Sequence, residues 1–227
     1  METKGRIELK YYINENDSYI LQNRLKHVMK VDPYSNQDGT YDTRSIYFEN
    51  SSNKIMNQKL DGLFERAKYR IRIYNNNLNS IKLEKKMKKN NQCFKEVCNI
   101  TQEEYAKICA NDLDFMIESQ ELLLRDLYIQ MSIYKLKPQI IVDYKRQPFI
   151  YEFGNVRVTL DSDIKTGITN TDIFNPNIDL ITAVDINLIV LEVKYDDYIP
   201  DVIKGLLNIS SRTQTAISKY VLCRRFY

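Results

Sequence analysis

Strict alternation of apolar and charged residues is the feature that most limits the folds open to this sequence. Successive side chains of a β-strand leave opposite faces of a sheet, so an alternation with a period of two indicates a strand. The pattern predicts about eight strands, at residues 6–12, 40–48, 68–74, 80–88, 93–100, 139–146, 156–161 and 187–195.

Five of these segments have one apolar face and one face made mostly of Lys, Arg and Glu. In segment 68–74, Ile71 and Ile73 share a face, and Arg70 and Arg72 share the opposite one. A single strand of this kind is simply explained as part of a sheet with one side in water. Several neighbouring strands with Arg-rich and Lys-rich faces would repel one another across the sheet, however. The same division is found in segments 6–12, 80–88, 156–161 and 187–195.

A curled sheet offers an alternative to the solvated face. If the sheet closes, the charged faces line a lumen and the apolar faces turn outward. So many cations away from water are unfavourable unless a polyanion lies between them. Arg binds phosphate through its planar fork and Lys binds it as a point charge. Both interpretations stay open for single strands, and the repetition favours the lumen.

Helical patterns lie between the strands. Asp17 can cap a helix over about 17–30, Thr101 and Glu104 form a capping box, and 118–134 is amphipathic, with Leu122, Leu123, Ile129 and Ile133 among polar residues. Short helices are expected at 52–59 and 200–207, and a loop at 166–178. We therefore predict an α+β fold in one domain, 1–227: an antiparallel β-barrel of about eight strands with a charged lumen and helices packed outside.

Composition excludes several classes of site. The single His27 argues against a Ser-His-Asp triad or a His-rich metal centre, and six Gly residues form no phosphate-binding glycine loop. The four Cys residues have no zinc-ligand spacing and are expected to be free thiols. With no apolar run of membrane-spanning length and no apolar signal region, we expect a soluble, cytoplasmic protein. The 33 Lys and Arg against 30 Asp and Glu identify no partner by themselves.

A series of motifs in this order resembles the VTC domain. This is the polyphosphate polymerase domain of vacuolar transporter chaperone complexes and of free-standing bacterial proteins, within the CYTH-like superfamily of triphosphate tunnel metalloenzymes. Single motifs are weak, but the whole series extends over nearly the entire chain. The motifs are Glu8-Leu9-Lys10-Tyr11, Lys59-Leu60-Asp61-Gly62, Lys68-Tyr69-Arg70-Ile71-Arg72-Ile73-Tyr74, Leu83-Glu84-Lys85-Lys86, Phe94-Lys95-Glu96, Tyr144-Lys145-Arg146-Gln147-Pro148, Arg157-Val158-Thr159-Leu160-Asp161, Leu191-Glu192-Val193-Lys194-Tyr195 and Ser218-Lys219-Tyr220.

The resemblance implies a tunnel that binds ATP and polyphosphate with a divalent metal, Mn²⁺ or Mg²⁺, and extends the polyphosphate chain. It also implies a role for Glu192 as metal ligand and for Ser218 at the terminal phosphate. Catalytic roles would fall to Lys10, Arg70, Arg72 and Lys86. Phosphate contacts would fall to Lys10, Arg70, Arg72, Lys86, Lys95, Arg146, Arg157, Ser218 and Lys219.

Two departures from the superfamily pattern bear on the reaction. Arg6 stands where the hydrolases and class IV adenylyl cyclases begin with Glu, and the late strand has Glu192 followed by Lys194 in place of a second Glu. Fewer carboxylates mean fewer metal ligands, which weakens the triphosphatase and cyclase interpretations and agrees with the polymerase type. We also expect no coupling to transport, because the sequence has none of the membrane helices of the eukaryotic complex.

The leading hypothesis is therefore an ATP-dependent polyphosphate polymerase. Phosphoryl transfer to an anionic phosphate oxygen needs positioning and charge neutralisation more than a general base, so one His is no obstacle. An inorganic triphosphatase and a non-catalytic polyphosphate- or nucleotide-binding module remain alternatives, and we expect no nucleic-acid partner. Three points stay open: whether Glu8 and Glu84 pair with cations or bind metal, whether Lys68, Lys82 and Lys194 join the site, and the oligomeric state. The Tyr residues are expected to pack or to line the barrel rim.

Overall fold

One large antiparallel sheet organises the molecule. The computed structural model describes residues 5–90, 92–167, 170–185, 187–208 and 212–226, and within these ranges the sheet has ten strands. Eight form a continuous path in the order β1-β10-β8-β7-β3-β4-β5-β6, with β2 paired to β7 and β9 to β8. The path strands are β1 (Ile7–Ile13), β3 (Tyr41–Glu49), β4 (Glu65–Tyr74), β5 (Ile81–Lys89), β6 (Gln92–Ile100), β7 (Lys137–Tyr151), β8 (Val156–Gly167) and β10 (Ile189–Tyr195).

The predicted strands correspond to these eight. Each predicted segment overlaps one of them, and β7 and β8 extend several residues beyond the predicted ends. The sequence did not predict β2 (Lys30–Val31) or β9 (Leu180–Thr182), which are too short to show a period. The predicted loop at 166–178 begins with the last two residues of β8 and leads into β9, which pairs back onto β8; residues 168–169 of that loop lie outside the described residues.

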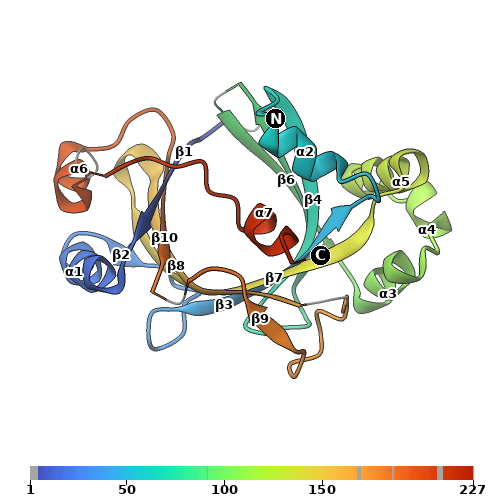
Figure 1. The fold of residues 1–227 in the computed structure, drawn as a ribbon, viewed down its shortest axis with the longest axis horizontal. Helices are drawn as coiled ribbons and strands as arrows, with labels where there is room; N and C mark the ends of the chain where they lie inside the picture. Colours follow the sequence, from blue (N-terminus) through green and yellow to red (C-terminus); the bar gives the residue numbers. More distant parts are fainter. Residues whose placement is uncertain (1–4, 91, 168–169, 186, 209–211, 227) are drawn as a thin grey trace.

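The sheet is strongly curved, and its two edges meet at one point. Figure 1 shows it curling around α7 (Lys219–Arg224), which lies on the concave side. Arg6, just before β1, and Cys93 in β6 exchange two backbone hydrogen bonds of 3.1 Å. Within the described residues, β1 otherwise pairs with β10 alone. The prediction of an antiparallel sheet with helices outside is confirmed, whereas the structure does not show a fully hydrogen-bonded closed barrel.

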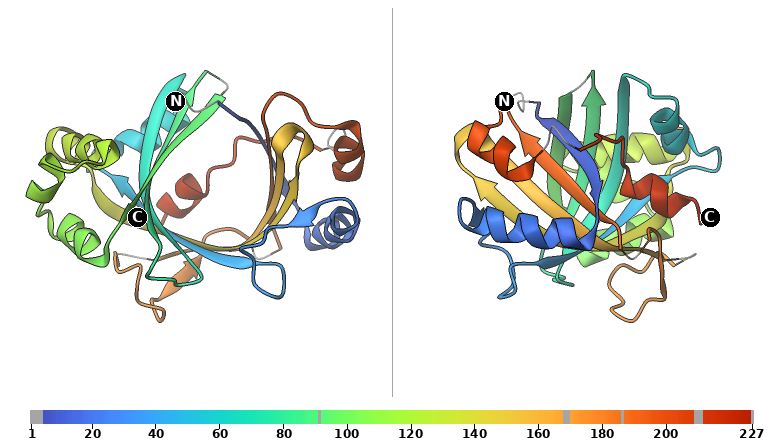
Figure 2. Two further views of the ribbon diagram at one scale, coloured as in Figure 1. Left: turned by 180° about the vertical axis from the view of Figure 1, so that it is seen from behind. Right: turned by 60° about the vertical axis from the view of Figure 1, so that its left-hand side comes forward.

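Helices cover the convex, apolar face of the sheet in two groups, which lie on opposite sides of the molecule in Figure 2. The first group is α1 (Glu15–Lys26) and α6 (Asp201–Leu207), whose Leu25 and Ile203 are buried with Val193 of β10. The second is α3 (Gln102–Ala110), α4 (Asp114–Ile117) and α5 (Leu122–Tyr134); α5 packs on β5 and β6, α3 on β7, and α4 on α5. α2 (Lys54–Leu60) precedes β4, and a short 3₁₀ turn, η1 (Phe153–Asn155), joins β7 to β8.

This arrangement follows from the alternation in the strands. Ile71, Ile73 and Leu83 have no exposed surface and belong to the core between sheet and helices. Because strand side chains alternate, their charged neighbours must point to the concave side. The burial pattern therefore agrees with the charged-lumen interpretation and excludes a charged face turned outward into bulk water.

The helix predictions were right in position and partly wrong in detail. The capping box of Thr101 and Glu104 is present, and both of its hydrogen bonds form. The first helix begins at Glu15 rather than Asp17, because Asn14 provides the cap by accepting from the Asp17 amide at 2.8 Å. The predicted helix at 118–134 begins instead at Leu122.

The buried face of α5 differs from the expected one. Leu123, Leu124, Leu127 and Met131 are buried, in the spacing of three or four residues that brings side chains onto one helix face. Of the expected apolar residues, Leu122, Ile129 and Ile133 are exposed instead. No helix in the described part of the chain is long and apolar enough to cross a membrane.

Candidate functional site

The ten phosphate-binding and metal-binding residues that the family resemblance implies all line one cavity on the concave side of the sheet. The cavity has a volume of about 280 Å³, and its walls come from most of the sheet and from the start of α7. Residues separated by up to two hundred positions in the sequence thus meet in one place. They are Lys10, Arg70, Arg72, Lys86, Lys95, Arg146, Arg157, Glu192, Ser218 and Lys219. We call this space the inner cavity.

Strand register places the charges opposite one another. Glu84 in β5 pairs with Arg70 in β4, Lys10 in β1 pairs with Glu192 in β10, and Arg146 in β7 pairs with Asp161 in β8. Directly opposed side chains on one face of an antiparallel pair lie close enough to interact. The inner cavity is therefore lined by ion pairs between neighbouring strands, rather than by cations alone.

Glu84 is the centre of the first group of ion pairs. It is almost completely buried, and its Oε2 accepts from Arg70 Nε at 2.6 Å, while Oε1 lies 2.5 Å from Lys95 Nζ. Arg72 Nη1 lies 4.0 Å from the same carboxylate. Burial alone would raise the pKa of Glu84, but Arg70, Arg72 and Lys95 outweigh it and hold the pKa well below its usual range.

Asp161 and Glu192 form a second group beside α7. Asp161 has no exposed surface; Arg146 donates to both of its oxygens, at 2.6 and 2.7 Å, and Lys219 Nζ lies at 2.5 Å. Glu192 lies 2.5 Å from Lys194 and 3.9 Å from Lys219. Against the effect of burial, these cations lower the pKa of both carboxyls. Sequence patterns assign no role to Asp161, yet this carboxylate ties Lys219, the first residue of α7, to the sheet.

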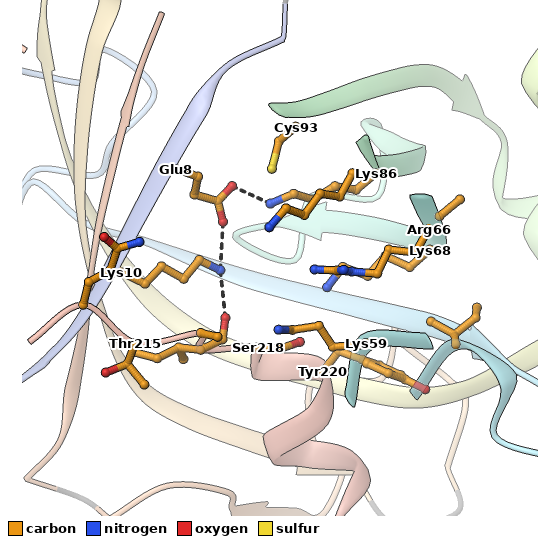
Figure 3. Close-up of a pocket in the computed structure, with 16 residues that line it drawn as sticks. Glu8, Lys10, Lys59, Arg66, Lys68, Lys86, Cys93, Thr215, Ser218 and Tyr220 are labelled. Atoms are coloured by element: carbon orange, nitrogen blue, oxygen red, sulfur yellow. Dashed lines mark hydrogen bonds and ion pairs between the residues drawn. The ribbon is translucent and has the colours of Figure 1, made fainter. Parts of the chain in front are cut away.

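Glu8 links the edge strand β1 to β5, the strand next to the opposite edge, through side chains. Figure 3 shows its carboxylate between Lys10 of the same strand, at 2.9 Å, and Lys86 of β5, at 2.5 Å. The inner carboxylates are thus shared among cations: in the structure, Glu8 and Glu84 both pair with Lys or Arg. Lys194 also belongs to the site through Glu192. Lys82 does not line the cavity.

Tyrosine hydroxyls form a further part of the inner cavity that the sequence analysis missed. Tyr47 accepts from Arg70 at 2.7 Å, Tyr144 from Arg72 at 3.2 Å, and Tyr41 from Arg157 at 3.0 Å. The alternation of side chains along a strand, which we call strand parity, could have identified these tyrosines. Tyr41 and Tyr47 share the inner face of β3, and Tyr144 shares the inner face of β7 with Arg146. We had instead assigned the Tyr residues to packing and to the rim.

The cations change the acidity of two phenols that line the inner cavity, Tyr47 and Tyr74. Burial alone would raise the pKa of Tyr47, but Arg70, Lys68 and Arg72 together lower it to about 7. The pKa of Tyr74 is likewise lowered to about 8, against the effect of burial, mainly by Arg72. A phenol that ionises so readily reports a strongly positive local potential.

Lys68 differs from the other inner cations because no described carboxylate lies within 4.0 Å of its ammonium group. Its Nζ lies 5.5 Å from the ring centroid of Tyr47 and 5.8 Å from that of Tyr220. Burial, together with the charges of Lys86 and Lys10, lowers the pKa of Lys68 to about 7. Near neutral pH its amine is therefore partly uncharged, and a bound anion would favour its protonation.

The carboxylates fit a metal that arrives with phosphate better than a preformed metal site. No group of three or more His, Cys, Asp or Glu side chains suitable for a metal exists in the described part of the chain. Glu8 and Glu192 both face the inner cavity. Burial and the charge of Glu192 act to raise the pKa of Glu8, but Lys10, Lys86 and Lys194 outweigh them and hold that pKa well below its usual range. In phosphoryl-transfer sites, Mg²⁺ is commonly held by one or two carboxylates and by substrate phosphates. Mn²⁺ accepts the same oxygen ligands.

Comparisons with known proteins agree with this geometry. Residues 5–226 match the family model of the VTC domain. Among solved structures, a protein from Bacillus halodurans described as a candidate adenylate cyclase has a TM-score of 0.60 at 18% identity and covers 100% of both chains. A Hippeastrum protein with a dominant triphosphatase activity has a TM-score of 0.53 at 14% identity, covering 99% of this chain and 96% of its own. At such low identity, the structural similarity shows a shared fold and nothing more. A search of curated protein sequences gives no match.

Proposed function

Because this chain belongs to the VTC domain family, whose CYTH-like relatives are triphosphate tunnel metalloenzymes, we propose that it is an ATP-dependent polyphosphate polymerase. In this proposal, residues 1–227 act as one domain, and the phosphates of ATP and polyphosphate bind along the concave side of the sheet. The observation that carries the proposal is the convergence of all ten expected residues on the inner cavity.

The charge balance of the inner cavity supports a polyanionic ligand. Among the described residues, eleven Lys and Arg side chains line it against two Glu. Four further carboxylates pair with these cations without lining the space, so positive charge remains in excess; they are Asp32, Glu84, Asp161 and Asp196. Arg70, Arg72 and Arg146 offer planar forks that match phosphate oxygens. The space, of about 280 Å³, lies on the concave side of the sheet and is too small for a duplex.

Ser218 adds a specific contact to this general attraction. Its hydroxyl oxygen is buried and has no hydrogen-bond partner in the described structure, although it lines the inner cavity. A buried hydroxyl without a partner is costly, and a phosphate oxygen would accept its hydrogen bond. This is the place where the family resemblance expects the terminal phosphate.

The proposed reaction transfers the γ-phosphoryl group of ATP to a polyphosphate end. A terminal oxygen of the chain attacks the γ-phosphorus, the bond from that phosphorus to the β,γ-bridging oxygen breaks, and the products are ADP and a chain longer by one phosphate. The attacking oxygen is already anionic, so no protein base has to remove a proton. Lys10, Arg70, Arg72 and Lys86 would orient the two anions and offset the charge that their approach brings together.

A divalent metal, Mn²⁺ or Mg²⁺, would be held by Glu192, with Glu8 nearby, and by the substrate phosphates. When bound, it would neutralise phosphate charge and polarise the transferred group. The remaining contribution of the protein is positional: the cations hold donor and acceptor in line within a space that excludes most water.

The test is to incubate the purified protein with ATP and Mn²⁺ and to measure polyphosphate and ADP. We expect both products in wild type and strongly reduced synthesis in Lys86→Gln, whose side chain is partly accessible and whose loss leaves Glu8 paired with Lys10. Lys26→Gln on the exposed side of α1 is the matched control and should retain full activity. Absence of both products would refute the proposal. Orthophosphate release from inorganic triphosphate without synthesis would favour a triphosphatase, and binding without turnover would favour a binding module.

A further inference from the structure

Glu49, the last residue of β3, is a buried carboxylate that the proposed reaction does not use. It has no exposed surface and does not line the inner cavity. It also forms no salt bridge with a described Lys or Arg, whereas four other buried carboxylates do: Glu8, Glu84, Asp161 and Glu192. An uncompensated buried carboxylate is costly, so the charge of Glu49 has to be stabilised in another way.

Backbone amides and one phenol bond the Glu49 carboxylate instead. Oε1 accepts from the amides of Asn50 and Ile55, both at 3.0 Å, and Oε2 accepts from the Met56 amide at 2.9 Å. Ile55 and Met56 belong to the first turn of α2, where amides have no partner within the helix. Oε2 also accepts from the Tyr220 hydroxyl of α7. One carboxylate thus joins the end of β3, the start of α2 and the first turn of α7.

The Tyr220 hydroxyl is suited to a permanent bond of this kind. Burial and the hydrogen bond to Glu49 raise the pKa of this phenol, whereas the pKa of Tyr47 is lowered to about 7. Tyr220 therefore keeps its proton and remains a donor throughout the neutral range. Its ring is buried and lies 5.3 Å, centroid to centroid, from the ring of Tyr47. The side chain is thus held by packing around the ring and by Glu49 at the hydroxyl.

Ser218 lies two residues before Tyr220, and Figure 3 shows both residues at the start of α7. A Ser at this position commonly accepts from an amide of the first helical turn, but the Ser218 side chain makes no such bond. Its hydroxyl has no hydrogen-bond partner in the described structure and lines the inner cavity. The hydroxyl is thus available to a ligand, and the backbone of the first turn of α7 determines where it points.

Other contacts hold α7 less directly. Lys219 forms an ion pair at 2.5 Å with a carboxylate of β8, but it does so through a flexible stem of four carbons. Arg224 donates to Asn53 Oδ1 at 2.7 and 3.1 Å, at the far end of the helix. A Tyr side chain has only two torsions. The bond from Tyr220 to Glu49 therefore fixes the first turn of α7 more closely than the ion pair of Lys219 can.

We propose that Tyr220, held by Glu49, is a positioning residue for phosphate binding: its hydrogen bond orients the first turn of α7 so that the Ser218 hydroxyl faces the terminal phosphate. The inference rests on the proposed function, in which Ser218 contacts that phosphate. Neither Tyr220 nor Glu49 lines the inner cavity, so both act through Ser218.

A double-mutant cycle on the affinity for inorganic triphosphate tests this role. Calorimetry in EDTA would compare wild type, Tyr220→Phe, Ser218→Ala and the variant with both changes. Ser218→Ala should weaken binding about tenfold, because a hydrogen bond to a charged group is lost. Tyr220→Phe should weaken it about fivefold, and the double variant should bind within about twofold of Ser218→Ala, because Tyr220 acts through that hydroxyl. Losses that multiply to about fiftyfold, or no loss in Tyr220→Phe, would overturn the proposal.

Tyr69→Phe is the matched control that separates positioning from stability. Tyr69 is buried on the convex side of the sheet, and its hydroxyl donates to Asp126 at 2.6 Å. Each Tyr→Phe change removes one hydrogen bond to a carboxylate, so both variants should melt about 3–12 °C below wild type. Tyr69→Phe should nevertheless bind triphosphate as wild type does.

The control also distinguishes the two ways in which the account could fail. A loss of triphosphate affinity in Tyr69→Phe equal to that in Tyr220→Phe would mean that lowered stability alone weakens binding, and it would overturn the positioning role. Absence of triphosphate binding in wild type would instead refute the proposed phosphate site. Because the cycle measures binding without turnover, its outcome does not depend on polyphosphate synthesis.

Discussion

Glu84→Gln is the change that most clearly separates the role of the inner carboxylates from that of the cations. The substitution keeps the shape of the side chain and removes its charge. Glu84 is 1% exposed and lies 2.5 Å from Lys95 Nζ and from Arg70 Nη2, with Arg72 at 4.0 Å. Its removal leaves the buried guanidinium group of Arg72, the mostly buried one of Arg70 and a half-exposed ammonium group without this counter-ion. Breaking a buried ion pair in this way costs about 3–5 kcal/mol of unfolding free energy.

The same change should strengthen anion binding. In wild type, the carboxylate of Glu84 competes with phosphate oxygens for Arg70, Arg72 and Lys95. Without it, we expect the affinity for inorganic triphosphate to rise about tenfold, or about 1.4 kcal/mol. Ligand at a hundred times its dissociation constant stabilises a protein by about 2.7 kcal/mol, so triphosphate should restore much of the lost stability.

Thermal unfolding and calorimetry with and without triphosphate measure both effects. For a protein of this size, roughly 2–4 °C accompany each kcal/mol, so the empty variant should melt about 6–20 °C lower than wild type. Glu65→Gln is the matched control: Glu65 lies 3.5 Å from Lys89 in an exposed pair, and surface pairs contribute little. A Glu84→Gln protein that melts like wild type, or that binds triphosphate more weakly, would refute this account of the cavity.

Four further predictions follow from the same charges. The pKa of Lys68, near 7 when empty, should rise when an anion binds, so triphosphate binding at pH 8 should take up more protons in wild type than in Lys68→Met, by up to about one proton; equal uptake in calorimetry across buffers would contradict this. Asp161→Asn should lower the free energy of unfolding in urea by about 3–5 kcal/mol, because two buried cations lose their partner; a change below about 1 kcal/mol would contradict it. Glu8 and Glu84 have folded-state pKa values below the ordinary 4.5, so the stability they contribute is present above that pH and should be lost as pH falls below it. An equal free energy of unfolding in urea at pH 3 and at pH 6 would argue against this. Mn²⁺ should bind weakly to the empty protein and tightly only with triphosphate present, because Glu192 is already paired with Lys194; tight binding of Mn²⁺ alone would show a preformed site.

The alternation in the strands predicted much of the fold and of the site. Because the side-chain period is two, one apolar residue such as Ile71 fixes the side of the sheet to which Arg70 and Arg72 point. The apolar face had to meet helices, so the charged face had to be concave. That reasoning, with the family resemblance, brought together residues from β1 to α7 in one cavity.

Parity alone did not predict which charges pair. The contact of Arg146 with Asp161 depends on the register between β7 and β8, which shifts between Asp143 and Lys145. Lys219 reaches the same carboxylate from α7, far along the chain. Such pairings depend on tertiary placement that no local pattern encodes, and the balance of charge in the inner cavity emerged only from the structure.

Other misses have local causes. Tyr47 and Tyr144 were assigned to packing because an aromatic ring in a strand suits either face, and only the neighbouring Arg residues make their hydroxyls part of the site. Asn14 and Asp17 are both good helix caps within one turn, and the sequence did not separate them. The closed barrel was predicted from the charged faces, yet parity shows where side chains point and not whether two strand edges pair.

A crystal structure with a non-hydrolysable nucleoside triphosphate tests the central claim, that the inner cavity is a phosphate-binding site, most directly. We predict that the triphosphate lies in the inner cavity, with its oxygens within hydrogen-bond distance of Arg70 and Arg72 and its terminal phosphate near Ser218. A triphosphate bound elsewhere on the molecule, with the ion pairs of Glu84 and Asp161 unchanged, would contradict the account.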